Sequence, residues 1–266
     1  MKKALCVAGF LVLAAGLPLW GYESSPSATQ VIPEAIWAAA TGGGTWVSEL
    51  YLTNYGPAAT DIYAMFSYGL GYRGPLLLVA GLNQNLSARF SNILSQLQTL
   101  DPSFTYYGRV GALYIASEAL GCRIQVLAKT VNGNFGKTFP GLSLIEGNTA
   151  AEGRSMTIQD LAQTSTYRTF VGAYNTGPYT YVVRFRIVDA DNIQAGSAFD
   201  KTLGSYHFMS FNPFTEAKAA PKDYEGCRLL VEVISGGSSY YGVALFGSIA
   251  NNSTNDTYAL IARMRN

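Results

Sequence analysis

The sequence repeats itself once, and this duplication constrains the possible folds more than any other feature. The motif Asn54-Tyr55-Gly56-Pro57 recurs 121 positions later as Asn175-Thr176-Gly177-Pro178. Further matches follow both copies in the same order, for example Leu113 with Val231, and the interval changes only between strand-like segments, where loops vary in length. A colinear series of this kind predicts two tandem units that share one fold.

Each unit has the residue pattern of β structure. Short runs rich in Val, Ile, Tyr, Phe and Thr alternate apolar and polar positions. Turn-forming pairs such as Asn132-Gly133 and Gly236-Gly237 separate these runs. Long helical patterns do not intervene. We therefore predict an all-β chain of two tandem antiparallel β-sandwich domains, immunoglobulin-like in architecture.

The alternation also predicts the domain boundaries. The first β-sandwich domain is expected over residues 30–141 and the second over residues 154–266. Periodicity stops over residues 142–153, which we interpret as the linker.

Two segments are predicted to be helical. Within residues 91–100, the apolar side chains of Ile93, Leu94 and Leu97 share one helical face, and Asp101-Pro102 ends the pattern. Residues 156–162 are expected to form a helical turn that opens the second unit.

The first residues are typical of an export signal. Lys2 and Lys3 precede an apolar run over residues 4–17, which is shorter than the about 20 residues that span a bilayer. We predict a signal peptide over residues 1–21, with cleavage as late as residue 28; a buried N-terminal helix is the other interpretation. The mature chain is then secreted, extracellular or in the cell envelope, without a membrane span. Cys6 lies inside the apolar run, not just after it where a lipid-anchored protein carries its cysteine.

Composition excludes several classes of protein. Charged residues make up only 13% of the chain, with 18 basic and 17 acidic side chains, whereas the usual charged share is about 25%. No basic excess favours nucleic acid as a partner. His207 is the single histidine, so catalytic or zinc sites built on several histidines are not expected.

No motif nominates a catalytic residue, a cofactor or a metal. Gly69-Leu70-Gly71-Tyr72-Arg73-Gly74 has the spelling of a dinucleotide fingerprint, but Pro75 and the apolar run behind it favour a turn between strands. His207 lies in an alternating segment and is interpreted as a packed side chain. The oxygen-rich segments 189–192 and 251–256 contain the ligand types of calcium, yet Asn and Asp also stabilise turns, which is the interpretation we favour.

Two cysteines follow the predicted signal peptide. In an oxidising compartment Cys122 and Cys227 could form a disulfide. The alternative is that both are buried, unbonded and act as small apolar side chains.

Tyrosine clusters and one turn supply the candidate binding residues. Because successive strand residues point to opposite faces, each cluster should present at least one ring outward. Outward aromatic rings can stack on sugars or anchor a protein partner. The candidates are Tyr106, Tyr107, Tyr179, Tyr181, Tyr240, Tyr241, Asn251, Asn252, Asn255 and Asp256.

Three segments also carry a family resemblance. They are the strand Tyr167-Arg168-Thr169-Phe170 before its Asn-x-Gly-Pro turn, the loop Asn132-Gly133-Asn134-Phe135-Gly136, and the loop Asn251-Asn252-Ser253-Thr254-Asn255-Asp256. In these the chain resembles a group of uncharacterised secreted bacterial proteins built from a duplicated β-sandwich unit. It departs from them at Val47-Ser48, where the Arg-Thr pair of the first strand is missing. The resemblance implies architecture and export, and it transfers no mechanism.

These observations predict an exported, non-catalytic binding or structural protein. It would recognise a glycan or protein partner at the cell surface or in the extracellular space, as in adhesion or carbohydrate binding, or self-associate through edge strands. The alternative is a secreted carbohydrate-active enzyme of the glycoside hydrolase type, which needs two facing carboxylates. Its acidic candidates are Glu49, Asp61, Glu118, Asp189, Glu225 and Glu232.

Overall fold

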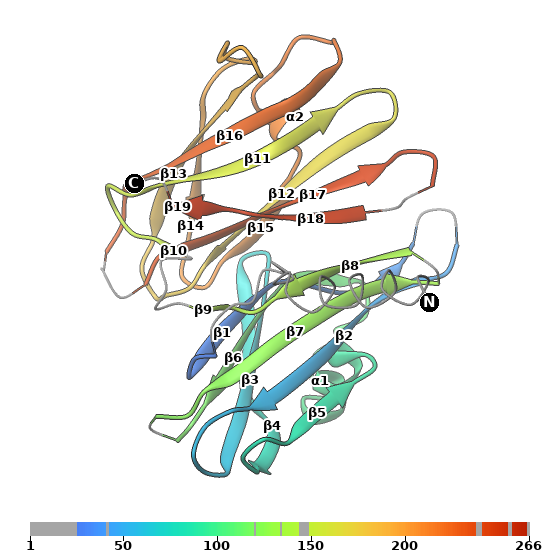
Figure 1. Cartoon of the computed structure of the whole chain (residues 1–266), viewed down its shortest axis with the longest axis vertical. Coiled ribbons are helices and arrows are strands. Elements are labelled where there is room, and N and C mark those ends of the chain that lie inside the picture. Colours follow the sequence, from blue (N-terminus) through green and yellow to red (C-terminus); the bar gives the residue numbers. More distant parts are fainter. Residues whose placement is uncertain are drawn as a thin grey trace, which may run out of the picture.

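The computed structural model describes residues 26–40, 43–119, 121–133, 135–143, 149–237, 241–254 and 257–264. These residues form antiparallel β-strands and two short helices (Figure 1), so the predicted all-β class is confirmed. The predicted signal peptide lies outside the described residues, as do Tyr240, Asn255 and Asp256. Among the described residues, no helix has the length and hydropathy needed to cross a membrane.

The first half of the chain folds one sheet of nine strands into two facing layers, because the end of β1 also pairs with the start of β2. Layer A holds β5 (Ser87–Phe90), β2 (Thr45–Asn54), β7 (Ile124–Asn132) and β8 (Phe135–Pro140). Layer B holds β4 (Gly71–Leu82), β3 (Thr60–Tyr68), β6 (Arg109–Ser117), β1 (Thr29–Ala39) and β9 (Leu142–Ser143).

The second half repeats this scheme with two five-stranded sheets. Layer C holds β15 (Phe208–Phe211), β12 (Tyr167–Asn175) and β17 (Val243–Asn251), with β18 (Thr257–Ile261) and β10 (Thr149–Ala150) paired to β17. Layer D holds β14 (Phe199–Leu203), β13 (Tyr181–Val188), β16 (Tyr224–Ser235), β11 (Ser155–Gln163) and β19 (Arg263–Met264).

Strand pairing is equivalent in the two halves. Layer C matches layer A and layer D matches layer B, strand by strand along the chain. Helices α1 (Ile93–Leu100) and α2 (Pro213–Glu216) follow β5 and β15, and each begins at an asparagine whose side chain accepts from backbone N–H groups, Asn92 and Asn212. The predicted helix over residues 91–100 is therefore confirmed as α1.

The helical turn predicted over residues 156–162 is wrong, because these residues lie in β11. Asp160 has a left-handed backbone (φ 63°), and the pairing register with β16 shifts between Ile158 and Leu161. This bulge resets the alternation, so that Met156, Ile158 and Leu161 are all buried. Their spacing then imitates that of a helix. Two short strands, β9 and β10, begin within the segment interpreted as the linker, whose residues 144–148 lie outside the described part.

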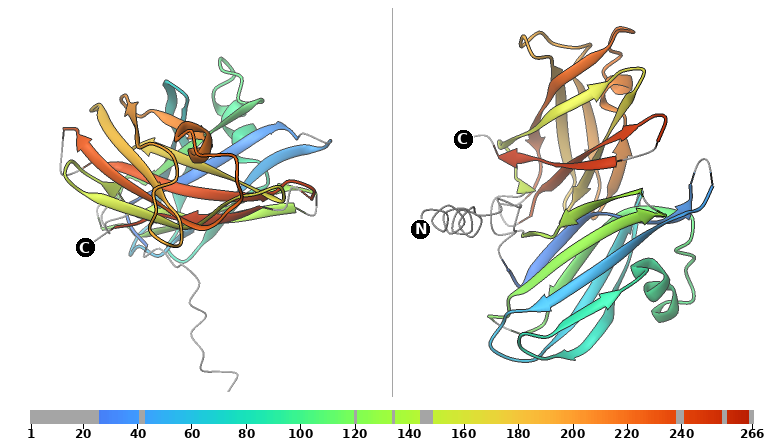
Figure 2. Two further views of the ribbon diagram at one scale, coloured as in Figure 1. Left: turned by 90° about the horizontal axis from the view of Figure 1, so that it is seen from above. Right: turned by 45° about the vertical axis from the view of Figure 1, so that its right-hand side comes forward.

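Each half has its own apolar core between its two layers, and a third core joins the halves. The outer face of layer B and the edge strand β8 of layer A pack against the outer face of layer C, and β8 lies beside β18 (Figures 1 and 2). The residues of the joining core are Val31, Ala112 and Phe139 from the first half and Tyr174, Phe208 and Phe246 from the second.

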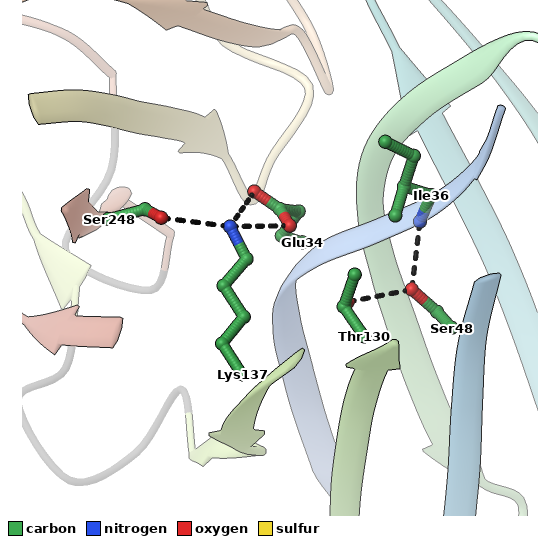
Figure 3. Close-up of polar contacts among 6 residues, drawn as sticks. All are labelled: Glu34, Ile36, Ser48, Thr130, Lys137 and Ser248. Atoms are coloured by element: carbon green, nitrogen blue, oxygen red, sulfur yellow. Dashed lines mark hydrogen bonds and ion pairs between the residues drawn. The ribbon is translucent and has the colours of Figure 1, made fainter. Parts of the chain in front are cut away.

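A largely buried ion pair also lies at this interface (Figure 3). Lys137 Nζ in β8 is 2.9 Å from Glu34 Oε1, and it donates to Ser248 Oγ in β17 at 2.9 Å. The side chains of Lys137 and Glu34 are only 9% and 13% exposed. Glu34 follows Pro33 at the register shift of β1, which turns its carboxylate toward the second half.

Candidate binding surface

The repeated Asn-x-Gly-Pro motif builds the same turn in both halves. The buried Asn175 side chain accepts from the N–H of Gly177 at 2.9 Å and donates to the carbonyls of Tyr179 and, at 2.6 Å, Gly204. The Asn54 side chain makes the equivalent bonds, to the Gly56 N–H and to two backbone carbonyls. Each buried amide therefore fixes a turn to a neighbouring loop.

In the second half this turn presents a pair of tyrosines. Tyr179 is 46% exposed, and its ring centroid lies 6.3 Å from that of Tyr241. Two glycines make room for the rings: a Cβ on Gly177 would lie 2.4 Å from the Tyr241 ring, and one on Gly237 would lie 2.6 Å from the Tyr179 ring. The two rings consequently lie against backbone and are held in place.

The aromatic surface continues across the interface between the halves. Tyr206, in the loop from β14 to β15, donates its N–H to the Gly177 carbonyl at 3.0 Å and packs edge-on against Tyr72 of the first half, with ring centroids 5.1 Å apart. Ser67 donates its hydroxyl to the Tyr206 carbonyl, and the Phe208 N–H donates to the Gly69 carbonyl at 3.1 Å. These bonds hold the turn between β3 and β4 against the second half.

We call this surface the tyrosine strip; it comprises Leu70, Tyr72, Tyr179, Tyr206 and Tyr241. Leu70 is 87% and Tyr72 47% exposed. Burial, together with the nearby Tyr241, Tyr114 and Tyr72, raises the pKa of Tyr206, so its hydroxyl stays protonated. A protonated tyrosine offers an apolar ring face and a hydroxyl that both donates and accepts. The strip can therefore stack on a ring of a ligand and hydrogen-bond to its polar edge.

The structure separates the predicted tyrosines into three groups. Tyr179 and Tyr241 belong to the strip. Tyr107 is exposed but packs edge-on against Trp37, with centroids 5.3 Å apart. Tyr106 and Tyr181 are wrong as binding residues, because both side chains are fully buried in the cores, where no partner reaches them.

The side chains of Asn251 and Asn252 stabilise the turn in which they lie. Asn251 Oδ1 accepts from the N–H groups of Ser253 and Thr254, at 2.8 and 3.0 Å. Asn252 accepts from Arg168 Nη1 at 2.7 Å. The turn interpretation of this segment is confirmed for the residues that the structure describes, and the same holds for segment 189–192, where the Asp189 side chain accepts from backbone N–H groups. In the described part of the chain no three His, Cys, Asp or Glu side chains gather as a metal site would need.

Cys122 and Cys227 are free and buried, each in the core of a different half. A Cys122–Cys227 disulfide is therefore not formed, and the unbonded alternative describes the structure. The two residues are not equivalent in the duplication. Cys122 packs against Gly56, the place that Tyr241 takes against Gly177, and Cys227 lies within β16. Burial raises the pKa of the Cys227 thiol to about 11.

Two further predictions are confirmed. The segment from Gly69 to Gly74 forms the turn between β3 and β4 and the first residues of β4, not a phosphate-binding loop before a helix. His207 is a packed side chain, 9% exposed, and burial lowers its pKa.

Sequence reasoning missed Leu70, Tyr72 and Tyr206. Each lies in or beside a glycine-containing turn, but no local pattern shows that the turn of one half meets the turn of the other. The contact depends on the packing of layers B and C, which joins residues far apart in the chain.

No protein-family model matches the chain, and no curated protein matches it. Among solved structures, the crystal structure of the infectious bursal disease virus VP2 subviral particle aligns with 90% of this chain and 74% of that chain. The aligned residues are 10% identical and the TM-score is 0.21, so the alignment supports no argument about fold or function.

Proposed function

We propose that the protein is an exported, non-catalytic binding protein of the cell surface or extracellular space, and that the tyrosine strip contacts a glycan. We also propose that its halves are two tandem immunoglobulin-like sandwich domains, over residues 30–141 and 154–266. The observation that supports the binding function is the tyrosine strip itself. Four loops from both halves bring the exposed rings of Tyr72 and Tyr179 together there with the half-buried rings of Tyr206 and Tyr241, and hydrogen bonds fix these loops in advance of binding.

A glycan fits the strip better than a protein partner does. Sugars have apolar ring faces and polar edges, which match protonated tyrosines. Protein hot spots are usually desolvated pockets at the centre of a large apolar patch. Leu70 is the one aliphatic member of the strip, and its other four members carry hydroxyl groups that can pair with sugar hydroxyls.

The test is an array of neutral and acidic oligosaccharides, probed with the wild-type chain and with Tyr72→Ala and Tyr179→Ala. We expect wild type to bind a subset of the sugars, and each substitution to weaken that binding about tenfold by removing a stacking ring. Tyr55→Ala is the matched control, because Tyr55 is 48% exposed in the equivalent turn of the first half. An array without binding, or equal losses in all three variants, contradicts the assignment. Protein capture that depends on Tyr72 and Tyr179 would replace the glycan with a protein partner.

Export is tested separately by expressing the full chain and sequencing the N-terminus of the secreted product. We expect it to begin between residues 22 and 29. A full-length chain retained in the cytoplasm contradicts export.

A further inference from the structure

The outer face of layer D is free among the described residues, although the equivalent face of layer B is buried by the second half. Strand register places one row of side chains straight across it: Arg186 pairs with Leu230, Leu230 with Thr157, and Thr157 with Arg263. The residues on either side of this row in β13 and β16 are buried in the core. The row itself therefore points outward, since strand side chains alternate.

This face is hollowed where the arginines lie. A groove of about 550 Å³ is lined by Arg186, Arg228 and Arg263, with Leu230, Thr157 and Asn192 between and beside them. None of the described residues that line it is acidic. A separate hollow of about 370 Å³ adjoins the groove at Arg186 and Leu230, and it is lined by both Arg184 and Glu232, so that it is not an uncompensated basic site.

Two arginines of the groove, Arg186 and Arg228, differ in their bonds from Arg184, which lies in the next row. Arg184 is bound to Asp200 by two hydrogen bonds of 2.9 Å, which neutralise its charge. Arg228 donates to the uncharged amide of Asn192. Arg186 is exposed and, among the described residues, makes no ion pair or hydrogen bond. Positive charge is thus concentrated in a hollow whose described lining residues include no acidic side chain.

The duplication provides an internal comparison. By strand register, Arg186 and Arg228 correspond to Met65 and Ala112 of layer B, which are both buried, Ala112 in the core that joins the halves. Exposure to solvent requires only that the side chains at these positions be polar, and it does not require them to be positively charged. The presence of two arginines there, with a third across the groove, therefore favours an anionic ligand.

We infer that this arginine groove binds an acidic polysaccharide, a carbohydrate chain that carries carboxylate or sulfate groups. Guanidinium groups bind such oxyanions through paired hydrogen bonds. Thr157 and Asn192 can bond to sugar hydroxyls, and Leu230 offers an apolar contact. Arg186 and Arg263 are separated by three strand spacings, about 14 Å, which a chain with repeated anions spans and a single sugar does not. Eighteen basic against 17 acidic residues give no general attraction for nucleic acid.

The experiment measures binding of the full chain to polygalacturonate, dextran sulfate, neutral dextran and single-stranded DNA at low and physiological salt. We expect binding to polygalacturonate or dextran sulfate, weakened at least tenfold in Arg186→Gln/Arg263→Gln. Arg184→Gln is the matched control, since it removes an exposed arginine from the same sheet, and it should change affinity less than twofold. Thermal unfolding should be unchanged in all variants, because the side chains are exposed.

Several results overturn the inference: no binding to either acidic polymer, equal binding to neutral dextran or DNA, or an equal loss in Arg184→Gln. Tyr179→Ala separates the two sites, because it should leave polyanion binding intact. The proposal for the arginine groove can therefore be contradicted while that for the tyrosine strip is supported, and the reverse is equally possible.

Discussion

Two buried asparagines at equivalent places show how single side chains organise this molecule. Each bonds to backbone groups of its own turn and of a second segment that is distant in the sequence. In the second half, the loop so fixed carries Tyr179 and touches the loop that carries Tyr206. The geometry of the binding surface thus depends on a side chain that contacts no ligand.

We predict that Asn175→Ala lowers the free energy of unfolding by about 3 kcal/mol, because the Gly177 N–H and the Tyr179 carbonyl lose their side-chain partner. Urea denaturation measures the change. Asn252→Ala is the control: it removes an exposed amide and should cost less than about 1 kcal/mol. Equal losses of unfolding free energy in the two variants would show that the buried Asn175 amide contributes no more to stability than an exposed amide does.

His207 makes stability depend on pH. Burial lowers its pKa below the usual value of about 6.5, so the unfolded chain binds the proton more readily. This contribution to stability is fully present above the unfolded pKa and is lost as pH falls toward the folded pKa. We expect the urea midpoint to fall between pH 7.5 and pH 5.5, and to fall less in His207→Gln. The same pH dependence in both chains would contradict the assignment.

The tyrosines also show what residue patterns can and cannot predict. One ring of the pair Tyr106 and Tyr107 is exposed, but the pair lies in the loop between α1 and β6, so the strand alternation expected there does not explain it. Tyr179 and Tyr181 are two apart and would share a face of one strand. They differ in burial because β13 begins at Tyr181, so Tyr179 belongs to the turn. Strand ends are set by tertiary hydrogen bonds, here those of Asn175, which local sequence does not reveal.

At the level of elements, β17 and the second half of β12, residues 171–175, are buried on both faces because they lie between two cores. Gly172 of β12 is paired with Phe246 of β17, and a Cβ on Gly172 would lie 1.8 Å from the Phe246 ring. The ring lies over the glycine and packs edge-on against Phe139 of the first half, with centroids 5.3 Å apart. This glycine is therefore required by packing.

We predict that Gly172→Ala destabilises the protein by about 3 kcal/mol, because the Phe246 ring must leave its place between the halves. Gly204→Ala is the matched control, since nothing lies within 4 Å of its Cβ position; it should change stability by less than about 0.5 kcal/mol. Thermal unfolding of both variants measures the two changes in stability. An equally mild effect at Gly172 would mean that the ring relocates freely.

Element-level prediction from sequence succeeded where the alternation is regular and failed where it is interrupted. The strands and α1 were predicted, but the bulge at Asp160 imitated a helix. The match of Leu113 with Val231 was also displaced by two residues. Strand register makes Leu113 equivalent to Leu229, because they pair with the equivalent residues Phe66 and Ile187. A pattern of period two cannot detect a slip of two.

For the whole molecule, the two copies have diverged according to the face that each covers. Tyr174, Phe208 and Phe246 of layer C face the first half, whereas by strand register the same positions of layer A are Thr53, Ser87 and Leu127. The duplication was recognisable from shared residues. The interface and the arginine groove depend on residues that differ between the two copies. A search for residues that the copies share therefore cannot find them.

The ion pair between Lys137 and Glu34 provides the test of how firmly the halves are joined. Lys137→Met would leave the Glu34 carboxylate buried without its partner and remove the bond to Ser248, at an expected cost of about 3 kcal/mol. The double variant Lys137→Met/Glu34→Gln should recover most of that loss, because no buried charge remains. A double-mutant cycle by urea denaturation measures both. Lys201→Met, which breaks the more exposed pair with Glu216, should cost under about 1 kcal/mol. If Lys137→Met costs no more than this control, the ion pair does not hold the halves together, and the tyrosine strip, which spans them, would depend on the apolar core alone.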